Sequence, residues 1–145
     1  MKKTIVIIGG YFDPLHIGHL EYITEAKKLG DILLVVVNNN EQAKLKKGYC
    51  FMDDKDRLEI VRNIKDVDVA MLSIDRDETI NMSIHELFHK FARDYKLIFA
   101  KGGDRTQDNT PEVDTCERLG IKCVFGISRV LNSSRRLVEN AKKMG

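Results

Sequence analysis

The sequence predicts an α/β fold, a Rossmann-like, doubly wound parallel five-stranded sheet in a single domain of residues 1–145. Short apolar runs rich in β-branched residues alternate with segments of helical periodicity along the chain. The apolar runs show little polar alternation, which is typical of parallel strands covered by helices on both faces. The expected strands are residues 4–8, 32–37, 67–73, 97–100 and 122–125.

Helical periodicity occupies the segments between these runs. Gly30 and Gly120 stand where helices are expected to end, and Ser133 stands where an N-cap is expected. The chain shows no repeat, linker or low-complexity segment, and 145 residues fit one domain with its own core. The expected helices are residues 17–29, 53–64, 82–95, 111–119 and 134–143.

The composition argues against several classes of protein. The net charge is +2, which is too close to neutral for a protein that binds nucleic acid through phosphate contacts. The three cysteines are odd in number and lack CxxC spacing, as expected in a reducing compartment. The first apolar run covers only residues 5–8, and no run approaches the roughly 18 residues of a membrane span. We therefore expect a cytoplasmic protein without nucleic-acid or membrane partners.

Three segments that follow expected strands carry unusual residues. They are residues 9–19, 101–105 and 126–134. In an open parallel sheet, ligands bind beyond the carboxyl ends of the strands. We therefore expect these three segments to converge on one ligand site.

The first of these segments reads GGYFDPLHIGH and leads from a strand into a helix. A helix N-terminus offers unpaired N–H groups and the positive end of the helix dipole to an anion. His16 and His19 are three residues apart and could both donate to phosphate oxygens there, while Gly18 leaves room for the phosphate. Such donors would stabilise the charge that develops on a five-coordinate α-phosphorus.

This segment resembles the signature of the HxGH nucleotidyltransferase superfamily. The resemblance is strongest to glycerol-3-phosphate cytidylyltransferase and to the adenylyltransferase domain of ADP-heptose synthase, and it extends over nearly the whole chain. It implies that His16 and His19 contact the triphosphate, and that Gly10, Phe12 and Asp13 shape the nucleotide loop. Tyr11, also assigned to nucleotide binding, stands where these families usually carry Thr or Ser.

Basic residues follow the second expected strand. Lys44, Lys46 and Lys47 lie in an expected polar loop, where ammonium groups would neutralise the anions of a phosphate-on-phosphate reaction. The resemblance assigns the catalytic lysine to Lys46, with Lys44 and Lys47 near the substrate. It also implies that Arg57 either fixes the lysine segment or meets the substrate phosphate.

Two later motifs complete the predicted site. Lys101, Gly102, Gly103 and Asp104 follow the fourth strand, and the paired glycines suggest a close approach of backbone to ligand. By resemblance to the heptose-phosphate enzymes, Asp104 lies beside the nucleoside. Near the C-terminus, a pair of serines would begin a helix and form a second anion site. The resemblance assigns this phosphate site to Arg129, Ser133 and Ser134, and Arg135 and Arg136, where relatives carry Ser, Thr or an apolar residue, are alternative arginines for the phosphate.

A second motif, HELFH from His85 to His89, matches the zinc-protease pattern HExxH. The two histidines flank an apolar stripe that already explains the helix as a cover for the sheet. A zinc site also needs a third ligand. We therefore expect partly exposed histidines here and no protein-bound metal.

These observations predict direct, in-line transfer of a nucleotidyl unit from CTP or ATP to a phosphorylated polyol, sugar or amino-alcohol, with release of pyrophosphate. Mg²⁺ is expected to be carried by the triphosphate, and relatives suggest a homodimer. The lysine and HxGH motifs favour CTP, which we place first, and the motif at Lys101 favours ATP. Alternative acceptors are heptose phosphate, phosphopantetheine and flavin mononucleotide. A catalytically silent nucleotide-binding regulator and a zinc hydrolase are the alternatives from other classes.

Overall fold

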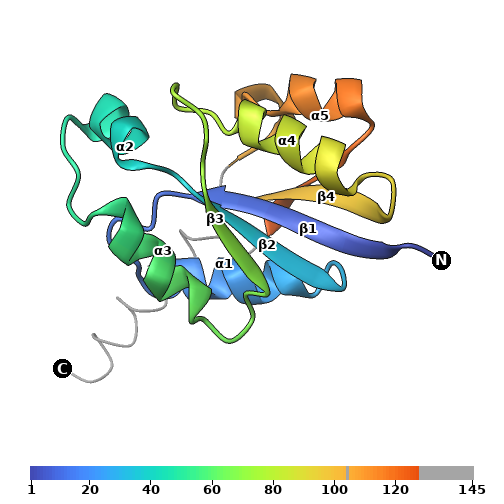
Figure 1. Cartoon of the computed structure of the whole chain (residues 1–145), viewed down its shortest axis with the longest axis horizontal. Coiled ribbons are helices and arrows are strands. Elements are labelled where there is room, and N and C mark those ends of the chain that lie inside the picture. Colours follow the sequence, from blue (N-terminus) through green and yellow to red (C-terminus); the bar gives the residue numbers. More distant parts are fainter. Residues whose placement is uncertain (104, 128–145) are drawn as a thin grey trace.

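The computed structural model describes residues 1–103 and 105–127. All five expected strands are present and form one parallel sheet in the order β3-β2-β1-β4-β5, so the predicted fold class is confirmed (Figure 1). β1 lies at the centre, which places the loop that follows it at the middle of the sheet edge. The strands are β1 (Lys3–Gly10), β2 (Ile32–Val37), β3 (Val69–Leu72), β4 (Tyr95–Gly102) and β5 (Lys122–Ile127).

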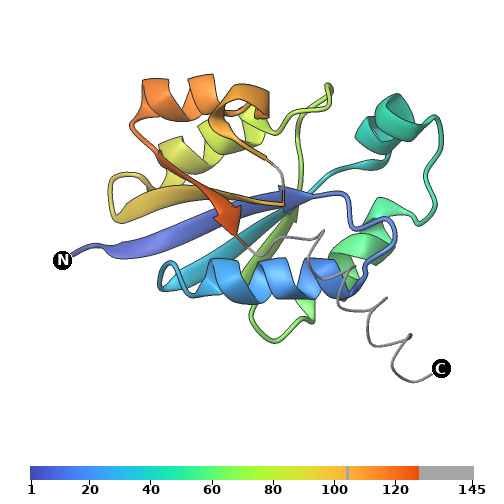
Figure 2. The same cartoon turned by 180° about the vertical axis from the view of Figure 1, so that it is seen from behind.

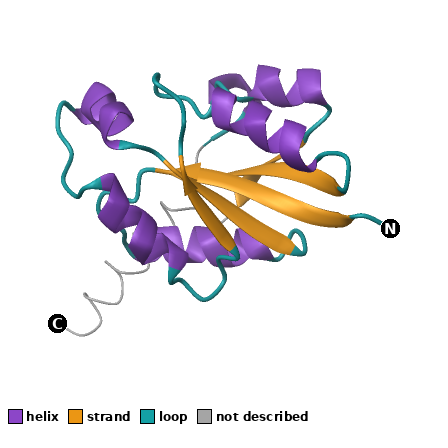
Figure 3. Ribbon diagram, in the orientation of Figure 1, coloured by secondary structure: helices purple, strands orange, loops and turns teal. Residues whose placement is uncertain are grey.

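Helices cover both faces of the sheet. One face carries α1 and α3 and the other carries α4 and α5, an arrangement that is visible from both sides of the molecule (Figures 2 and 3). The expected helix 134–143 and its cap Ser133 lie outside the described residues. The α-helices are α1 (Ile17–Lys27), α2 (Asn40–Lys47), α3 (Asp54–Arg62), α4 (Asn81–Phe91) and α5 (Val113–Leu119), and a short 3₁₀ helix spans Gln107–Asn109.

Two apolar cores lie on opposite faces of the sheet. Ile5 and Ile7 of β1 pack with α4 and α5, whereas Val6 and Ile8 pack with α1 and α3. Successive side chains of a strand point to opposite faces, so burial on both faces requires the continuous apolar runs in the sequence. Cys123 lies on β5 and packs against the first of these cores.

The prediction of a polar loop after β2 is wrong, because most of this segment forms the helix α2. Asn39 caps this helix by accepting from the backbone N–H of Gln42 at 2.9 Å, and the Gln42 side chain accepts from the N–H of Asn39 at 3.0 Å. Gly48, with a φ of 82°, ends it. Capping holds α2 in place although it buries little apolar surface, and the helix lies beyond the carboxyl end of the sheet (Figure 1).

The two glycines expected at helix ends have different roles. Gly120 has a φ of 72° and caps α5, as expected. α1 instead ends at Lys28 in ordinary helical geometry. A Cβ on Gly30 would lie 2.8 Å from Cγ2 of Val6, so this glycine allows the chain to pass close to β1.

Across residues 1–103 and 105–127, none of the helices combines the length and apolarity needed to cross a bilayer.

Candidate active site

A cleft of about 520 Å³ opens at the carboxyl ends of β1, β2 and β4. The expected convergence of the segments after β1 and β4 is therefore confirmed, while most of the third segment lies outside the described residues. Six residues of the predicted site line this cleft: Gly10, Tyr11, His19, Lys46, Lys101 and Gly102.

His16 and His19 form a fixed pair at the N-terminus of α1. His16 is the N-cap residue, and its Nδ1 accepts from the backbone N–H of Gly18 at 3.1 Å. The backbone N–H of His16 in turn donates to Nδ1 of His19 at 3.0 Å. Because both Nδ1 atoms accept, the neutral rings carry their protons on Nε2. The pair is therefore prepared to donate two Nε2–H bonds to an anion.

His19 is held in its neutral form. Burial, together with the smaller effect of the neighbouring His16, lowers the pKa of His19 from 6.5 to about 4. The two ring centroids are 3.8 Å apart, and the buried ring of Phe12 meets His19 edge-on with the centroids 5.0 Å apart. A neutral imidazole donor at pH 7 stabilises charge without needing to gain or lose a proton.

The glycines of the first loop leave space for neighbouring side chains of the protein. Phe12 is 2% exposed and has a φ of 51°, which turns its ring back under the loop. A Cβ on Gly10 would lie 2.7 Å from this ring, and a Cβ on Gly9 would lie 2.8 Å from Cδ1 of Ile80. These glycines therefore leave space for side chains of the protein itself, Phe12 beneath the loop and Ile80 in the cleft lining.

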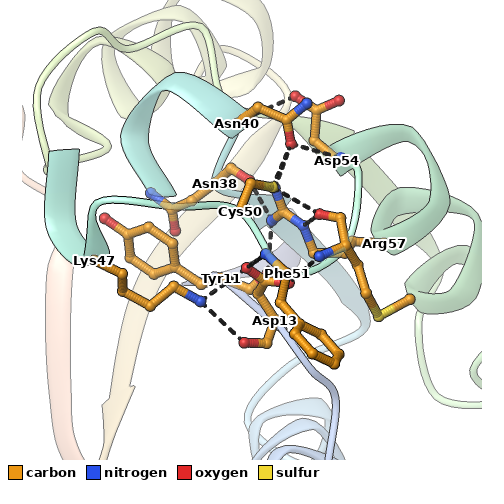
Figure 4. A network of polar contacts seen from close by, with 10 residues as sticks. Tyr11, Asp13, Asn38, Asn40, Lys47, Cys50, Phe51, Asp54 and Arg57 are labelled. Carbon is orange, nitrogen blue, oxygen red and sulfur yellow. Dashed lines mark hydrogen bonds and ion pairs between the residues drawn. The ribbon is translucent and has the colours of Figure 1, made fainter. Parts of the chain in front are cut away.

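Asp13 ties the first loop to the segment between α2 and α3. Its carboxylate accepts from the backbone N–H groups of Phe51 at 2.9 Å and Met52 at 2.6 Å, and it pairs with Nζ of Lys47 at 2.8 Å (Figure 4). Burial raises the pKa of this carboxyl, but the three hydrogen bonds outweigh burial and hold the pKa below its ordinary value. The Asp13 side chain thus holds the loop after β1 against the segment that follows α2.

Arg57 lies behind the cleft rather than in its lining. Its side chain is almost fully buried, and Nη1 donates to the carbonyls of Tyr11 at 2.7 Å and Asn38 at 2.6 Å. Nε donates to the carbonyl of Met52 at 2.9 Å, and Nη2 donates to Oδ1 of Asn40 at 3.1 Å (Figure 4). Of the two roles that the resemblance offered, this position favours fixing the neighbouring segments over meeting a substrate.

The three lysines of α2 differ in position. Lys46 lines the cleft, with its Nζ 4.5 Å from the ring centroid of Tyr11. Lys47 is engaged by Asp13, and Lys44 is exposed away from the cleft lining. Of these three, Lys46 is therefore the one placed to neutralise a bound anion.

The last residues of β4 bring Lys101 into the cleft. Burial lowers the pKa of its ammonium group, and the nearby Glu112 carboxylate partly offsets this effect. A Cβ on Gly102 would lie 2.5 Å from the carbonyl oxygen of Ile127 and 3.0 Å from the ring of Tyr22. The groups that lie close to Gly102 are therefore β5 and α1 of the protein, where the sequence suggested a ligand.

Two predicted glycines, Gly18 and Gly103, do not line the cleft. Gly18 is buried in the first turn of α1, and Gly103 has a φ of 62° after β4. Asp104, Arg129, Ser133 and Ser134 lie outside the described residues.

Sequence reasoning missed three polar residues of the cleft, Asn38, Glu78 and Glu112, and included Arg105 only as the end of the segment 101–105. Glu112 is 4% exposed and accepts from the backbone N–H of Ile80 at 3.1 Å. Its position directly before α5 was the available signal, because the starts of helices after parallel strands face the ligand edge of the sheet. The cleft therefore carries carboxylates as well as cations, and so suits a ligand with donor groups beside its phosphates.

The HExxH motif does not gather metal ligands. His85 and His89 are both exposed on α4, with ring centroids 6.4 Å apart. In residues 1–103 and 105–127, no three side chains of His, Cys, Asp or Glu are grouped to hold a metal ion.

Known proteins from two functional groups are similar to this chain over most of its length. The chain is 34% identical over 122 residues to the FAD synthase of Pyrococcus abyssi, covering 83% of this chain and 77% of that protein. It is 33% identical over 145 residues to the bifunctional protein HldE of Aliarcobacter butzleri, covering 98% of this chain but 28% of that protein. A solved structure of the lipopolysaccharide core biosynthesis protein from Thermoplasma volcanium superposes with a TM-score of 0.65 at 27% identity, covering 88% of this chain and 98% of that one.

A family model described as cytidylyltransferase-like matches residues 7–128, a span that contains the paired histidines, α2 and the segment after β4. The chain therefore belongs to the cytidylyltransferase-like family and is a nucleotidyltransferase.

Proposed function

We propose that this protein is an adenylyltransferase, which transfers the AMP unit of ATP to the phosphate of a small phosphorylated acceptor. The sequence motifs placed CTP ahead of ATP, but the relatives favour ATP. FAD synthase, by its name, makes a product that contains an adenylyl unit, and the relative from Pyrococcus abyssi is similar over 83% of this chain. The similarity to HldE over 98% of the chain agrees with the resemblance to the heptose-phosphate adenylyltransferases.

The observation that carries the proposed chemistry is the locked pair His16 and His19. An oxygen of the acceptor phosphate forms a bond to the α-phosphorus of ATP, and the bond between that phosphorus and the leaving pyrophosphate breaks. The acceptor oxygen is already ionised, so the reaction requires no covalent enzyme intermediate. Two Nε2–H donors fixed by backbone hydrogen bonds would stabilise the charge that builds on the α-phosphate oxygens.

Cations around the cleft would bind the remaining phosphate charge. Lys46, Lys101 and Arg105 approach from α2, from β4 and from the segment after β4. We propose that Mg²⁺ enters with the nucleotide, held mainly by triphosphate oxygens. The described residues fit this arrangement, because they gather no ligand cluster of their own, and a triphosphate needs only one or two protein ligands for its metal. When bound, the ion would neutralise charge on the leaving pyrophosphate.

Two acceptors follow from the relatives. Flavin mononucleotide is the phosphorylated precursor that adenylylation converts to FAD, and it is supported by the FAD synthase relatives. A heptose or other sugar phosphate is supported by the motif at Lys101 and by the HldE relative. The carboxylates Glu78 and Glu112 could accept hydrogen bonds from hydroxyl groups in either acceptor.

Pyrophosphate release tests the proposed function. Purified protein with Mg²⁺ is incubated with ATP or CTP, and each nucleotide is paired with flavin mononucleotide, a heptose phosphate or glycerol 3-phosphate. We expect release with ATP and one of the first two acceptors. Release with CTP and glycerol 3-phosphate alone would contradict the choice of ATP. A rise in melting temperature with ATP but no turnover with any acceptor would support the silent regulator instead.

A further inference from the structure

The hydroxyl group of Tyr11 is buried and has no hydrogen-bond partner among the described residues. Tyr11 nevertheless lines the cleft. Buried hydroxyls in proteins are almost always hydrogen-bonded, since an unpaired one loses its water without compensation. An unpaired hydroxyl at the wall of a ligand cleft therefore indicates a group that the ligand itself completes.

The backbone of Tyr11 is fixed before any ligand arrives. Its carbonyl accepts from Nη1 of the buried Arg57 at 2.7 Å, and the next residue, Phe12, is packed beneath the loop with 2% exposure. On the cleft side, the ammonium group of Lys46 lies 4.5 Å from the ring centroid of Tyr11. This is within the range of a cation–π contact, so the ring holds a flexible lysine in one place.

We propose that Tyr11 is a phosphate-binding and lysine-positioning residue, whose hydroxyl donates to a substrate phosphate oxygen while its ring holds the Lys46 ammonium toward the same phosphate. This inference rests on the proposed function of the cleft. The phosphate belongs either to ATP or to the acceptor, and the experiment below separates these two sources.

The surroundings make the Tyr11 hydroxyl a donor. Burial raises the pKa of this phenol, and the carboxylates of Glu78 and Glu112 raise it further, whereas the guanidinium groups of Arg105 and Arg57 lower it. The phenol therefore keeps its proton at neutral pH and needs an acceptor. With Lys46 on its ring and Arg105 lining the same cleft, an anionic acceptor such as a phosphate oxygen completes the arrangement.

Substitutions at Tyr11 separate the hydroxyl from the ring. Tyr11→Phe removes only the hydroxyl, and Tyr11→Leu removes the ring as well. We expect Tyr11→Phe to weaken Mg²⁺–ATP binding by about tenfold in calorimetry if the hydroxyl contacts the nucleotide, the scale of a hydrogen bond to a charged group. If the hydroxyl contacts the acceptor, ATP binding stays unchanged and the KM for the phosphorylated acceptor rises about tenfold. Tyr11→Leu should add a further loss of about threefold or more.

A double-mutant cycle with Lys46→Met tests the positioning role. In the wild-type background, Tyr11→Leu should weaken substrate binding more than Tyr11→Phe does. We expect this difference between the two variants to disappear in a Lys46→Met background, because the ring then has no ammonium group to hold. A purely structural role would leave that loss intact. The matched control is Tyr49→Phe, since Tyr49 lies outside the cleft lining and its ring also faces a lysine, with Nζ of Lys47 5.5 Å from the centroid.

The outcomes separate this inference from the proposed function. Wild-type protein that binds Mg²⁺–ATP and releases pyrophosphate, together with a Tyr11→Phe variant unchanged in both ATP affinity and acceptor KM, would overturn the role of Tyr11 alone. Wild-type protein that neither binds Mg²⁺–ATP nor releases pyrophosphate would overturn both proposals.

Discussion

His16 and His19 hold one another in place, because the backbone N–H of His16 donates to Nδ1 of His19 at 3.0 Å and their ring centroids are 3.8 Å apart. His19 lines the cleft, His16 lies beside it as the N-cap residue of α1, and each imidazole accepts a backbone N–H of the first helical turn. Removing either ring disturbs the donor that remains.

Alanine substitutions at these histidines should nearly abolish turnover. His16→Ala and His19→Ala each remove one Nε2–H donor, and we expect each to lower kcat by about 100-fold or more. Pyrophosphate release measures the loss. His85→Ala is the control, because His85 is an exposed histidine on α4 outside the cleft lining and its loss should leave turnover intact. Near-normal turnover in both active-site variants, with unchanged circular dichroism, would refute the mechanism.

The depressed pKa of His19 should make stability depend on pH. In the folded protein this pKa is about 4, compared with 6.5 for the free side chain. Between these values the unfolded chain binds more protons, so the free energy of unfolding falls as the pH is lowered from 6.5 toward 4. Urea denaturation across this range should show a weaker fall for His19→Asn than for the wild type. A His19 imidazole that titrates near pH 6.5 in NMR spectra would disprove this account.

Neighbouring lysines of α2 should affect different properties. Lys46→Met should lower kcat/KM at least tenfold with little change in stability, because Lys46 lines the cleft. Lys47→Met should lower the free energy of unfolding by about 1–3 kcal/mol, because it removes the partner of the buried Asp13 carboxylate. Lys44→Met is the stability control, with an expected change within about 0.5 kcal/mol. Equal stability losses at Lys44 and Lys47 would count against the assigned pairing with Asp13.

Loss of the buried guanidinium group should destabilise the protein strongly. Arg57→Met leaves the carbonyls of Tyr11, Asn38 and Met52 without their donor, and we expect a loss of at least about 3 kcal/mol in urea denaturation. Arg62→Met provides the comparison, since Arg62 forms an exposed pair with a glutamate on α3 and should cost about 0.5 kcal/mol. Similar losses in the two variants would mean that the Arg57 contacts do not support the fold.

The homodimer expected from relatives stays a prediction. Light scattering at micromolar concentration should give about twice the chain mass of 16.6 kDa. A mass of one chain would remove the dimer and leave the chemistry of the cleft untouched.

The sheet and the first loop were predictable because their signals are local. Continuous apolar runs predict buried parallel strands, and the paired histidines at positions 16 and 19 follow the first run directly. α2 was not predictable from apolar periodicity. It depends on the reciprocal cap between Asn39 and Gln42, with little buried apolar surface to reveal it.

The remaining features of the site depend on contacts between distant segments. Glu112 enters the cleft where α5 begins, and its carboxylate binds the N–H of Ile80, which lies 32 residues earlier. Lys46 and Lys47 are adjacent in sequence, but successive residues of a helix point about 100° apart, so one lines the cleft and the other meets Asp13. Gly102 resembles a ligand-contact glycine in sequence, yet its space is taken by β5.

The segment that contains α2 is anchored to the rest of the protein at both of its ends. Asn39 anchors one end of this segment and the amides of Phe51 and Met52, bound by Asp13, anchor the other. Between these anchors the chain exposes Leu45 and Tyr49 and contributes Lys46 to the cleft. The hydrogen bonds that fix the histidine pair lie within residues 16–19 and involve no residue of this segment. Exchange of exposed positions such as Leu45 and Tyr49 should therefore change the outer surface of this segment while both anchors and the histidine pair stay in place.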